Sequence, residues 1–327
     1  MNRATRDAFG EALIALADEG RDFVVVDGGV SAATRTSAFA REYPDRFLNC
    51  GISEQNLVSV AAGLAWSGVP VVAASFAGFL VNRAFDQMRL QIAQPSLNVT
   101  LVGSHGGITA GADGISAHAI EDLALVTALP GVSVAVPADA EETAAVLRTA
   151  ITTDGPFYLR LSKHKTPAGI SGEPCSVPGS LRMLRPGSDL TIVTHGVMVP
   201  AALAAAERLD AAGISAEVLN APWLWPFDRA MLVASARRTG RVLVVTEHLA
   251  TGGLVGVVTA VLARDFPVPV DWVALDGYAG SGPANHLLAA AGLTAEHIES
   301  AALALNTRPA DPAAVGRGQR SEPRNVR

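Results

Sequence analysis

Short apolar runs typical of buried strands alternate with helix-length segments along most of this 327-residue chain. The pattern begins with a predicted helix over residues 5–20 and a predicted strand over 23–26, which ends in Asp27-Gly28-Gly29. Helices are predicted over 54–66, 78–92 and 139–151, with strands over 71–74, 99–102, 132–136 and 157–161. Strands that alternate with helices pair in parallel, so the sequence predicts a doubly wound α/β fold.

The alternation is interrupted once, by residues 166–187, which are rich in Pro, Gly and Ser and lack periodicity. We predict a linker there, between a first α/β domain over residues 1–165 and a smaller α/β domain over 188–306. Residues 307–327 are rich in Arg, Pro and Gly without apolar periodicity, so we expect a disordered tail. The length of the chain also favours two domains.

Composition excludes several classes of protein. The net charge of -6 argues against nucleic acid as a partner, and no apolar stretch reaches the roughly 18 residues of a membrane span. Cys50 and Cys175 are the only cysteines, which predicts a reduced, cytoplasmic protein without a disulfide or metal site. Only 17% of residues are charged, which indicates that another subunit covers part of the surface.

Polar and aromatic residues follow several predicted strands, where ligands bind in open α/β sheets. Glu54 opens a nearly apolar helix, and either caps that helix or faces a partner in a dry site. Phe76 and Phe79 are either core residues or a stacking platform. His105, amid several glycines, and His118 are either structural or catalytic histidines.

Taken together, these positions resemble the C-terminal half of transketolase, in the split form whose two halves are separate chains. The resemblance covers residues 4–305 and implies a pyrimidine-binding domain followed by the smaller transketolase C-terminal domain. Its first matching runs are Pro44-Asp45-Arg46-Phe47, Gly51-Ile52-Ser53-Glu54-Gln55-Asn56, Ser75-Phe76-Ala77-Gly78-Phe79 and Arg83-Ala84-Phe85-Asp86-Gln87-Met88-Arg89. The later runs are Ser104-His105-Gly106-Gly107-Ile108-Thr109, Gly111-Ala112-Asp113-Gly114, Glu121-Asp122-Leu123-Ala124, Val136-Pro137-Ala138-Asp139, Pro226-Phe227-Asp228 and Thr246-Glu247-His248 ahead of Gly252-Gly253.

The resemblance implies thiamine diphosphate as cofactor. Glu54 matches the family's glutamate, whose carboxyl group bonds the pyrimidine ring nitrogen and helps the coenzyme to lose a proton from its reactive carbon. Phe76 and Phe79 match aromatic residues packed on the pyrimidine, and Val30 takes the place of a leucine near the thiazolium ring.

The resemblance also implies a partner subunit. In the family the diphosphate and its divalent ion, such as Mg²⁺, are held by the N-terminal domain through a Gly-Asp-Gly…Asn motif, which this sequence lacks. We therefore expect an enzyme that is active only with an N-terminal transketolase subunit, as an α2β2 heterotetramer.

Substrate residues match the family less closely. Arg6 and His105 fall on positions that bind the substrate's phosphate or hydroxyl groups, and Asp113 on one that recognises a sugar hydroxyl. Lys163 replaces a phosphate-binding arginine, so it keeps the charge and loses the bidentate fork.

Three residues are candidates for catalytic roles by this resemblance: Glu54, His105 and His118. His118 stands one place beyond the family's usual catalytic histidine, a position that Ala117 occupies here.

The implied activity is transfer of a two-carbon ketol unit from a ketose or ketose phosphate donor to an acceptor, in carbohydrate metabolism. The altered phosphate-binding positions favour a specialised pathway. Two alternatives stay open. One is a β-type subunit of the decarboxylating component of a 2-oxoacid dehydrogenase, or a 1-deoxyxylulose-5-phosphate synthase-like half. The other is a non-catalytic subunit that stabilises a partner.

Overall fold

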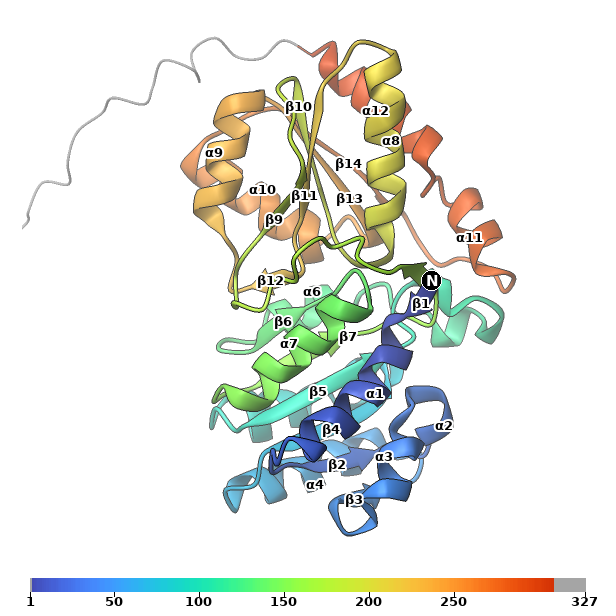
Figure 1. Ribbon diagram of the computed structural model, residues 1–327, viewed down its shortest axis with the longest axis vertical. Coiled ribbons are helices and arrows are strands. Elements are labelled where there is room, and N and C mark those ends of the chain that lie inside the picture. Colours follow the sequence, from blue (N-terminus) through green and yellow to red (C-terminus); the bar gives the residue numbers. More distant parts are fainter. Residues whose placement is uncertain (1, 309–327) are drawn as a thin grey trace, which may run out of the picture.

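The computed structural model describes residues 2–308, which form two mostly parallel sheets with helices on both faces of each (Figure 1). This arrangement confirms the predicted α/β class. No helix among these residues is both long enough and apolar enough to cross a bilayer.

The first sheet has seven strands in the order β12-β6-β7-β5-β4-β2-β3. All neighbours are parallel except β12, which runs antiparallel to β6. Its strands are β2 (Val24–Asp27), β3 (Phe47–Asn49), β4 (Val71–Phe76), β5 (Val99–Ser104), β6 (Ser133–Ala135), β7 (Phe157–Arg160) and β12 (Trp223–Trp225).

Helices cover both faces of this sheet. The apolar sides of α1, α3 and α7 pack on one face, and those of α4, α5 and α6 on the other. The helices are α1 (Thr5–Asp18), α2 (Ser31–Thr34), α3 (Thr36–Glu42), α4 (Glu54–Trp66), α5 (Ala77–Gln87), α6 (Asp122–Thr127) and α7 (Ala140–Thr152). The helix predicted over 78–92 is irregular, because Ala84 has non-helical dihedral angles and Met88–Ala93 form a π-helical turn.

The second sheet has five strands in the order β14-β13-β10-β11-β9. Helices α8 and α12 pack on one face, and α9 and α10 on the other. The strands are β9 (Arg182–Arg185), β10 (Leu190–Thr194), β11 (Ala216–Asn220), β13 (Val242–Leu249) and β14 (Val270–Leu275). The helices are α8 (Val199–Ala211), α9 (Arg229–Thr239), α10 (Gly253–Asp265), α11 (Ala284–Ala290) and α12 (Ala295–Asn306).

The segment predicted as a linker, 166–187, contains regular and packed structure. Strand β9 pairs antiparallel with β11 at the edge of the second sheet, and β8 (Lys165–Pro167) pairs with β1 (Asn2–Ala4). Cys175 and Leu181 are buried. The sequence did not predict strand β9, because the Pro and Gly residues around this short edge strand are typical of loops. Nearly all of the predicted tail lies outside the described residues, and the domain bounds 1–165 and 188–306 stay predictions.

The two halves of the chain are joined by more than one contact. Strand β12 follows β11 in sequence but belongs to the first sheet, beneath the second (Figure 1). Asn220 Nδ2 donates to Glu142 Oε1 over 2.9 Å, and Leu249 N donates to Ile120 O over 3.0 Å. Hydrogen bonds therefore join the two halves of the chain in addition to the strand that passes from one sheet to the other.

Candidate active site

Most of the predicted site residues gather in two neighbouring groups beside the carboxyl ends of β4 and β5, and Arg83, for which no role was predicted, joins one of them. We name them the Glu54 cluster (Glu54, Phe76, Phe79 and Arg83) and the His105 cluster (Arg6, His105, Asp113 and Lys163). The two clusters touch, because the rings of Phe76 and His105 stack with centroids 4.0 Å apart.

Glu54 is the first residue of α4, and its side chain is only 2% exposed. Arg83 Nη1 donates to Glu54 Oε2 over 3.0 Å. Arg83 stands four residues after Phe79 on α5, so both lie on one face of the helix. Its guanidinium carbon lies 4.5 Å from the centre of the Phe79 ring, a cation–π contact. A buried carboxylate is thus held beside an aromatic face.

Phe76 and Phe79 form a small stack next to that carboxylate. Their centroids are 5.9 Å apart, their planes differ by 11°, and both rings are half-buried. Partly exposed, nearly parallel rings beside a buried carboxyl group fit a flat heteroaromatic ring that carries a basic nitrogen. These residues therefore have the chemistry needed to hold the pyrimidine ring of a thiamine coenzyme.

Val30 lies at the end of β2, half-buried, immediately before α2. Its amide donates to Asp27 Oδ1 over 2.7 Å, while Asp27 Oδ2 accepts from Thr34 and Thr36. Asp27 therefore fixes the turn that presents Val30. Because β2 and β4 are parallel neighbours, Val30 and Phe76 lie at the same edge of the sheet.

The His105 cluster is a compact set of charged and polar groups. Arg6 Nη1 lies 2.9 Å from His105 Nε2, and Lys163 Nζ donates to Asp113 Oδ2 over 2.6 Å. His105 Nε2 lies 4.0 Å from Asp113 Oδ2, and His105 Nδ1 lies 2.9 Å from Ser104 Oγ. His105 has φ +60°, an uncommon conformation for a residue other than glycine, and such strain is often found at functional sites.

Burial, and next the charge of Arg6, lower the pKa of His105 to about 4. The imidazole is therefore neutral at pH 7 and can both donate and accept a hydrogen bond. Burial also lowers the pKa of Arg6.

His118 is 3% exposed and forms no side-chain hydrogen bond with either cluster in residues 2–308. Neither ring nitrogen forms a hydrogen bond of ordinary geometry with the described residues, although the Gly111 backbone is near. Burial lowers its pKa, and the charges of Asp113 and Lys163 are close enough to affect it in opposite directions.

The structure adds residues for which the sequence predicted no role. Arg83 lies in one of the matching runs, and its spacing of four from Phe79 was the available signal. Glu247 follows a predicted strand, and the sequence left its role open. Burial raises the pKa of Glu247 to about 7. Within residues 2–308, no group of three or more His, Cys, Asp and Glu side chains is placed to hold a metal ion.

Comparison with known proteins defines the class. The chain matches the family model "Transketolase, pyrimidine binding domain" over residues 1–168 and "Transketolase, C-terminal domain" over residues 179–298. Thus the fold is that of a transketolase pyrimidine-binding domain followed by a transketolase C-terminal domain.

Individual relatives agree. A "Putative transketolase C-terminal section" of Methanocaldococcus jannaschii is 37% identical, over 90% of this chain and 94% of its own. A "6-deoxy-6-sulfo-D-fructose transketolase subunit" of Clostridium sp. is 35% identical, over 91% of this chain and 92% of its own. A solved "Split gene transketolase, inactive beta4 tetramer" is 42% identical with a TM-score of 0.87, covering 93% of this chain and 99% of its own.

The chain belongs to the transketolase family and corresponds to its C-terminal section, as the resemblance predicted. It spans about half the length of other curated relatives that it matches.

Proposed function

We propose that this chain is the C-terminal subunit of a split transketolase-like enzyme, which transfers a two-carbon ketol unit from a ketose or ketose phosphate to an acceptor. One observation carries the proposal: the ring of His105 stacks on that of Phe76. The cluster suited to binding substrate therefore lies directly beside the aromatic pair and the carboxylate suited to binding a coenzyme ring. Family membership makes thiamine diphosphate the expected cofactor.

The Glu54 cluster would hold the coenzyme's pyrimidine ring. Glu54 would bond the ring nitrogen and exchange a proton with it, while Phe76 and Phe79 exclude water and Val30 packs near the second ring. When bound, thiamine diphosphate supplies the nucleophilic carbon that carries the ketol unit.

The His105 cluster would hold the substrate. Arg6 and Lys163 supply positive charge for an anionic group such as phosphate or sulfonate, and Asp113 accepts a hydrogen bond from a hydroxyl group. Neutral His105 orients a substrate oxygen. Within residues 2–308 the ring nitrogens of His118 form no hydrogen bond of ordinary geometry, which makes His118 a candidate for moving a proton to or from the substrate.

A second subunit would complete the site by holding the diphosphate and Mg²⁺, in an α2β2 assembly. Exposed apolar side chains along α4 support such an interface: Ile52, just before Glu54, and Trp66, at the far end of the helix, are each 73% exposed, and Leu90 beside Trp66 is 43% exposed. Ser59, Ala62, Trp66 and Leu90 line a hollow between α4 and the π-helical turn. Patches of this kind mark interaction surfaces.

Two relatives support this arrangement and a specialised substrate. One similar structure is described as an inactive β4 tetramer, as expected if the C-terminal halves need their partner. A similar subunit acts on 6-deoxy-6-sulfo-D-fructose, and Lys163 in place of a phosphate-binding arginine fits a donor other than an ordinary pentose phosphate. The unpaired Cys50 and Cys175 accord with a cytoplasmic location.

The test mixes this chain with an N-terminal subunit that carries the Gly-Asp-Gly…Asn motif. With thiamine diphosphate and Mg²⁺, we expect ketol transfer to an aldehyde acceptor, faster from 6-deoxy-6-sulfo-D-fructose than from xylulose 5-phosphate, and none from either subunit alone. Glu54→Gln should abolish transfer while the subunits still assemble. Full activity of that variant would indicate a non-catalytic subunit, and carbon dioxide release from pyruvate would indicate a decarboxylase.

A further inference from the structure

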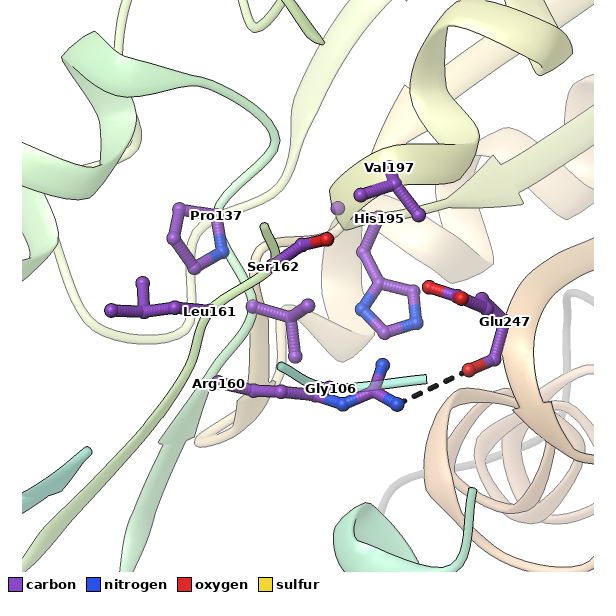
Figure 2. Close-up of a pocket in the computed structure, with 10 residues that line it drawn as sticks. Gly106, Pro137, Arg160, Leu161, Ser162, His195, Val197 and Glu247 are labelled. Carbon is purple, nitrogen blue, oxygen red and sulfur yellow. Dashed lines mark hydrogen bonds between the residues drawn. The ribbon is translucent and has the colours of Figure 1, made fainter. Parts of the chain in front are cut away.

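Glu247 lies near the end of β13 in the second domain and directs its carboxyl group at the first domain. The side chain is buried and accepts hydrogen bonds from Thr109 N and from Thr109 Oγ1, the latter over 3.1 Å. Figure 2 shows Glu247 and His195 facing Arg160 and Ser162 around a cavity. The cavity has space for about one water molecule, so it is no substrate pocket.

The first domain approaches this carboxyl group with its backbone. Gly107 has φ +76°, and a Cβ atom built there would lie 2.1 Å from Glu247 Cδ. Only glycine allows this approach. The turn that begins at Gly107 and carries Thr109 is therefore packed directly on the second domain.

Thr109 transmits this contact to a second segment of the first domain. Its hydroxyl oxygen lies 3.1 Å from Ser162 Oγ. Ser162 N donates to Thr5 Oγ1 over 2.8 Å, and Ser162 O accepts from Arg6 N over 3.2 Å. Three hydrogen-bonded links thus lead from Glu247 to the backbone of Arg6.

These same segments carry every member of the His105 cluster. Lys163 follows Ser162 and Arg6 follows Thr5 in sequence, while His105 and Asp113 lie on either side of the Gly107–Thr109 turn. A small shift of Thr109 would therefore change the spacing of the whole cluster.

We propose that Glu247 is a positioning residue for substrate binding. It holds the two segments that carry the His105 cluster in place, so the second domain shapes substrate recognition without contacting substrate. The inference rests on the proposed function of the His105 cluster.

The kinetic test uses the assembled enzyme and whichever donor, 6-deoxy-6-sulfo-D-fructose or xylulose 5-phosphate, it uses better. Glu247→Ala should raise the donor KM by about tenfold or more, with a much smaller change in kcat, since misplacing binding groups by about 1 Å has effects of this order. Glu247→Gln should restore the KM, because its amide can accept from Thr109 N and donate to Thr109 Oγ1.

Glu142→Ala is the matched control. Glu142 is also a buried carboxyl that bonds across the domain junction, to Asn220, but the structure gives it no link to Thr109 within the described residues. Both alanine variants should lower Tm, and only Glu247→Ala should raise the donor KM. Amide hydrogen exchange in the isolated chain should quicken at residues 106–113 in Glu247→Ala and not in Glu142→Ala.

A folded Glu247→Ala with the wild-type donor KM would overturn the proposal, as would an equal rise in Glu142→Ala. If Glu247→Ala does not fold, Thr109→Val takes its place in the kinetic test. This variant removes the hydroxyl group that joins Glu247 to Ser162, so an unchanged donor KM would reject the proposal. If the wild-type complex uses neither sugar and binds no thiamine diphosphate, the proposed function fails. The exchange experiment still reports whether Glu247 holds the turn.

Discussion

Arg83 Nη1 lies 3.0 Å from Glu54 Oε2, so a half-exposed guanidinium neutralises a carboxylate that is almost fully buried. The same guanidinium stacks on Phe79. Arg83 thus stabilises both the charge and the aromatic wall of the Glu54 cluster.

Removing Arg83 should leave the Glu54 carboxylate buried without its partner. We expect Arg83→Gln to lower the free energy of unfolding by about 1–2 kcal/mol, as for a lost hydrogen bond to a buried group. The control is Arg89→Gln, which breaks the exposed pair with Asp86 and should cost less than about 0.5 kcal/mol. Urea unfolding of the isolated chain measures both. Equal losses in the two variants would contradict the role given to Arg83.

Stability should depend on pH through Glu142. Burial raises the pKa of its carboxyl group from 4.5 to about 7, so the folded chain keeps a proton that the unfolded chain releases between those values. Relative to Glu142→Gln, the wild type should therefore lose stability as pH rises from about 4.5 to about 7, by up to about 1.4 kcal/mol per pH unit, and then level off.

Asn220→Ala provides a second measurement on the same carboxyl group. Asn220 donates to Glu142 and favours its ionised form, so the variant should raise the pKa of Glu142 and extend the pH-dependent range upwards. Unfolding free energies measured across pH test both statements. A constant difference between the wild type and Glu142→Gln would contradict them.

His105 should stay neutral well below the usual range of histidine. Its pKa is lowered from 6.5 to about 4, first by burial and next by the charge of Arg6. Arg6→Gln should therefore raise the pKa of His105 while leaving it below 6.5. An NMR titration follows the imidazole, with His105→Asn to identify its signal. Titration near 6.5 in the wild-type chain would show that the cluster is more open than described.

Lys163 should contribute to binding an anionic donor. We expect Lys163→Ala to raise the KM for the sulfonated or phosphorylated sugar by about tenfold, equivalent to about 1.4 kcal/mol. Lys165→Ala removes an exposed lysine two residues further on and should leave that KM unchanged. Similar effects of both variants would indicate general attraction by positive charge instead of a specific contact.

Much of the fold could be predicted because buried parallel strands such as β2 and β4 begin as apolar runs and lie between helices. Strand β12 was missed since its three residues pair with β6, far away in the sequence. Helix α12 was also missed, although Ile298, Ala302 and Leu305 follow a helical spacing and are buried.

Some residues of the candidate site could be predicted and others could not, again because only local patterns are visible in the sequence. Phe76 and His105 stand in recognisable runs just after predicted strands, where an α/β sheet binds ligands, and Glu54 opens a predicted helix. The contacts of Arg83 with Glu54 and of Glu247 with Thr109 join residues 29 and 138 positions apart. Packing between helices and between domains decides such contacts, and local patterns do not contain them.

Calorimetric titration of thiamine diphosphate, with Mg²⁺ present, tests the central claim most directly. It is carried out on this chain alone and on its mixture with the N-terminal subunit, with wild-type Glu54 and with Glu54→Ala. We predict saturable binding only in the mixture, at one coenzyme per copy of this chain, and markedly weaker binding with Glu54→Ala. Unchanged affinity in that variant, or equally tight binding by this chain alone, would contradict a coenzyme site shared between two subunits and built on Glu54.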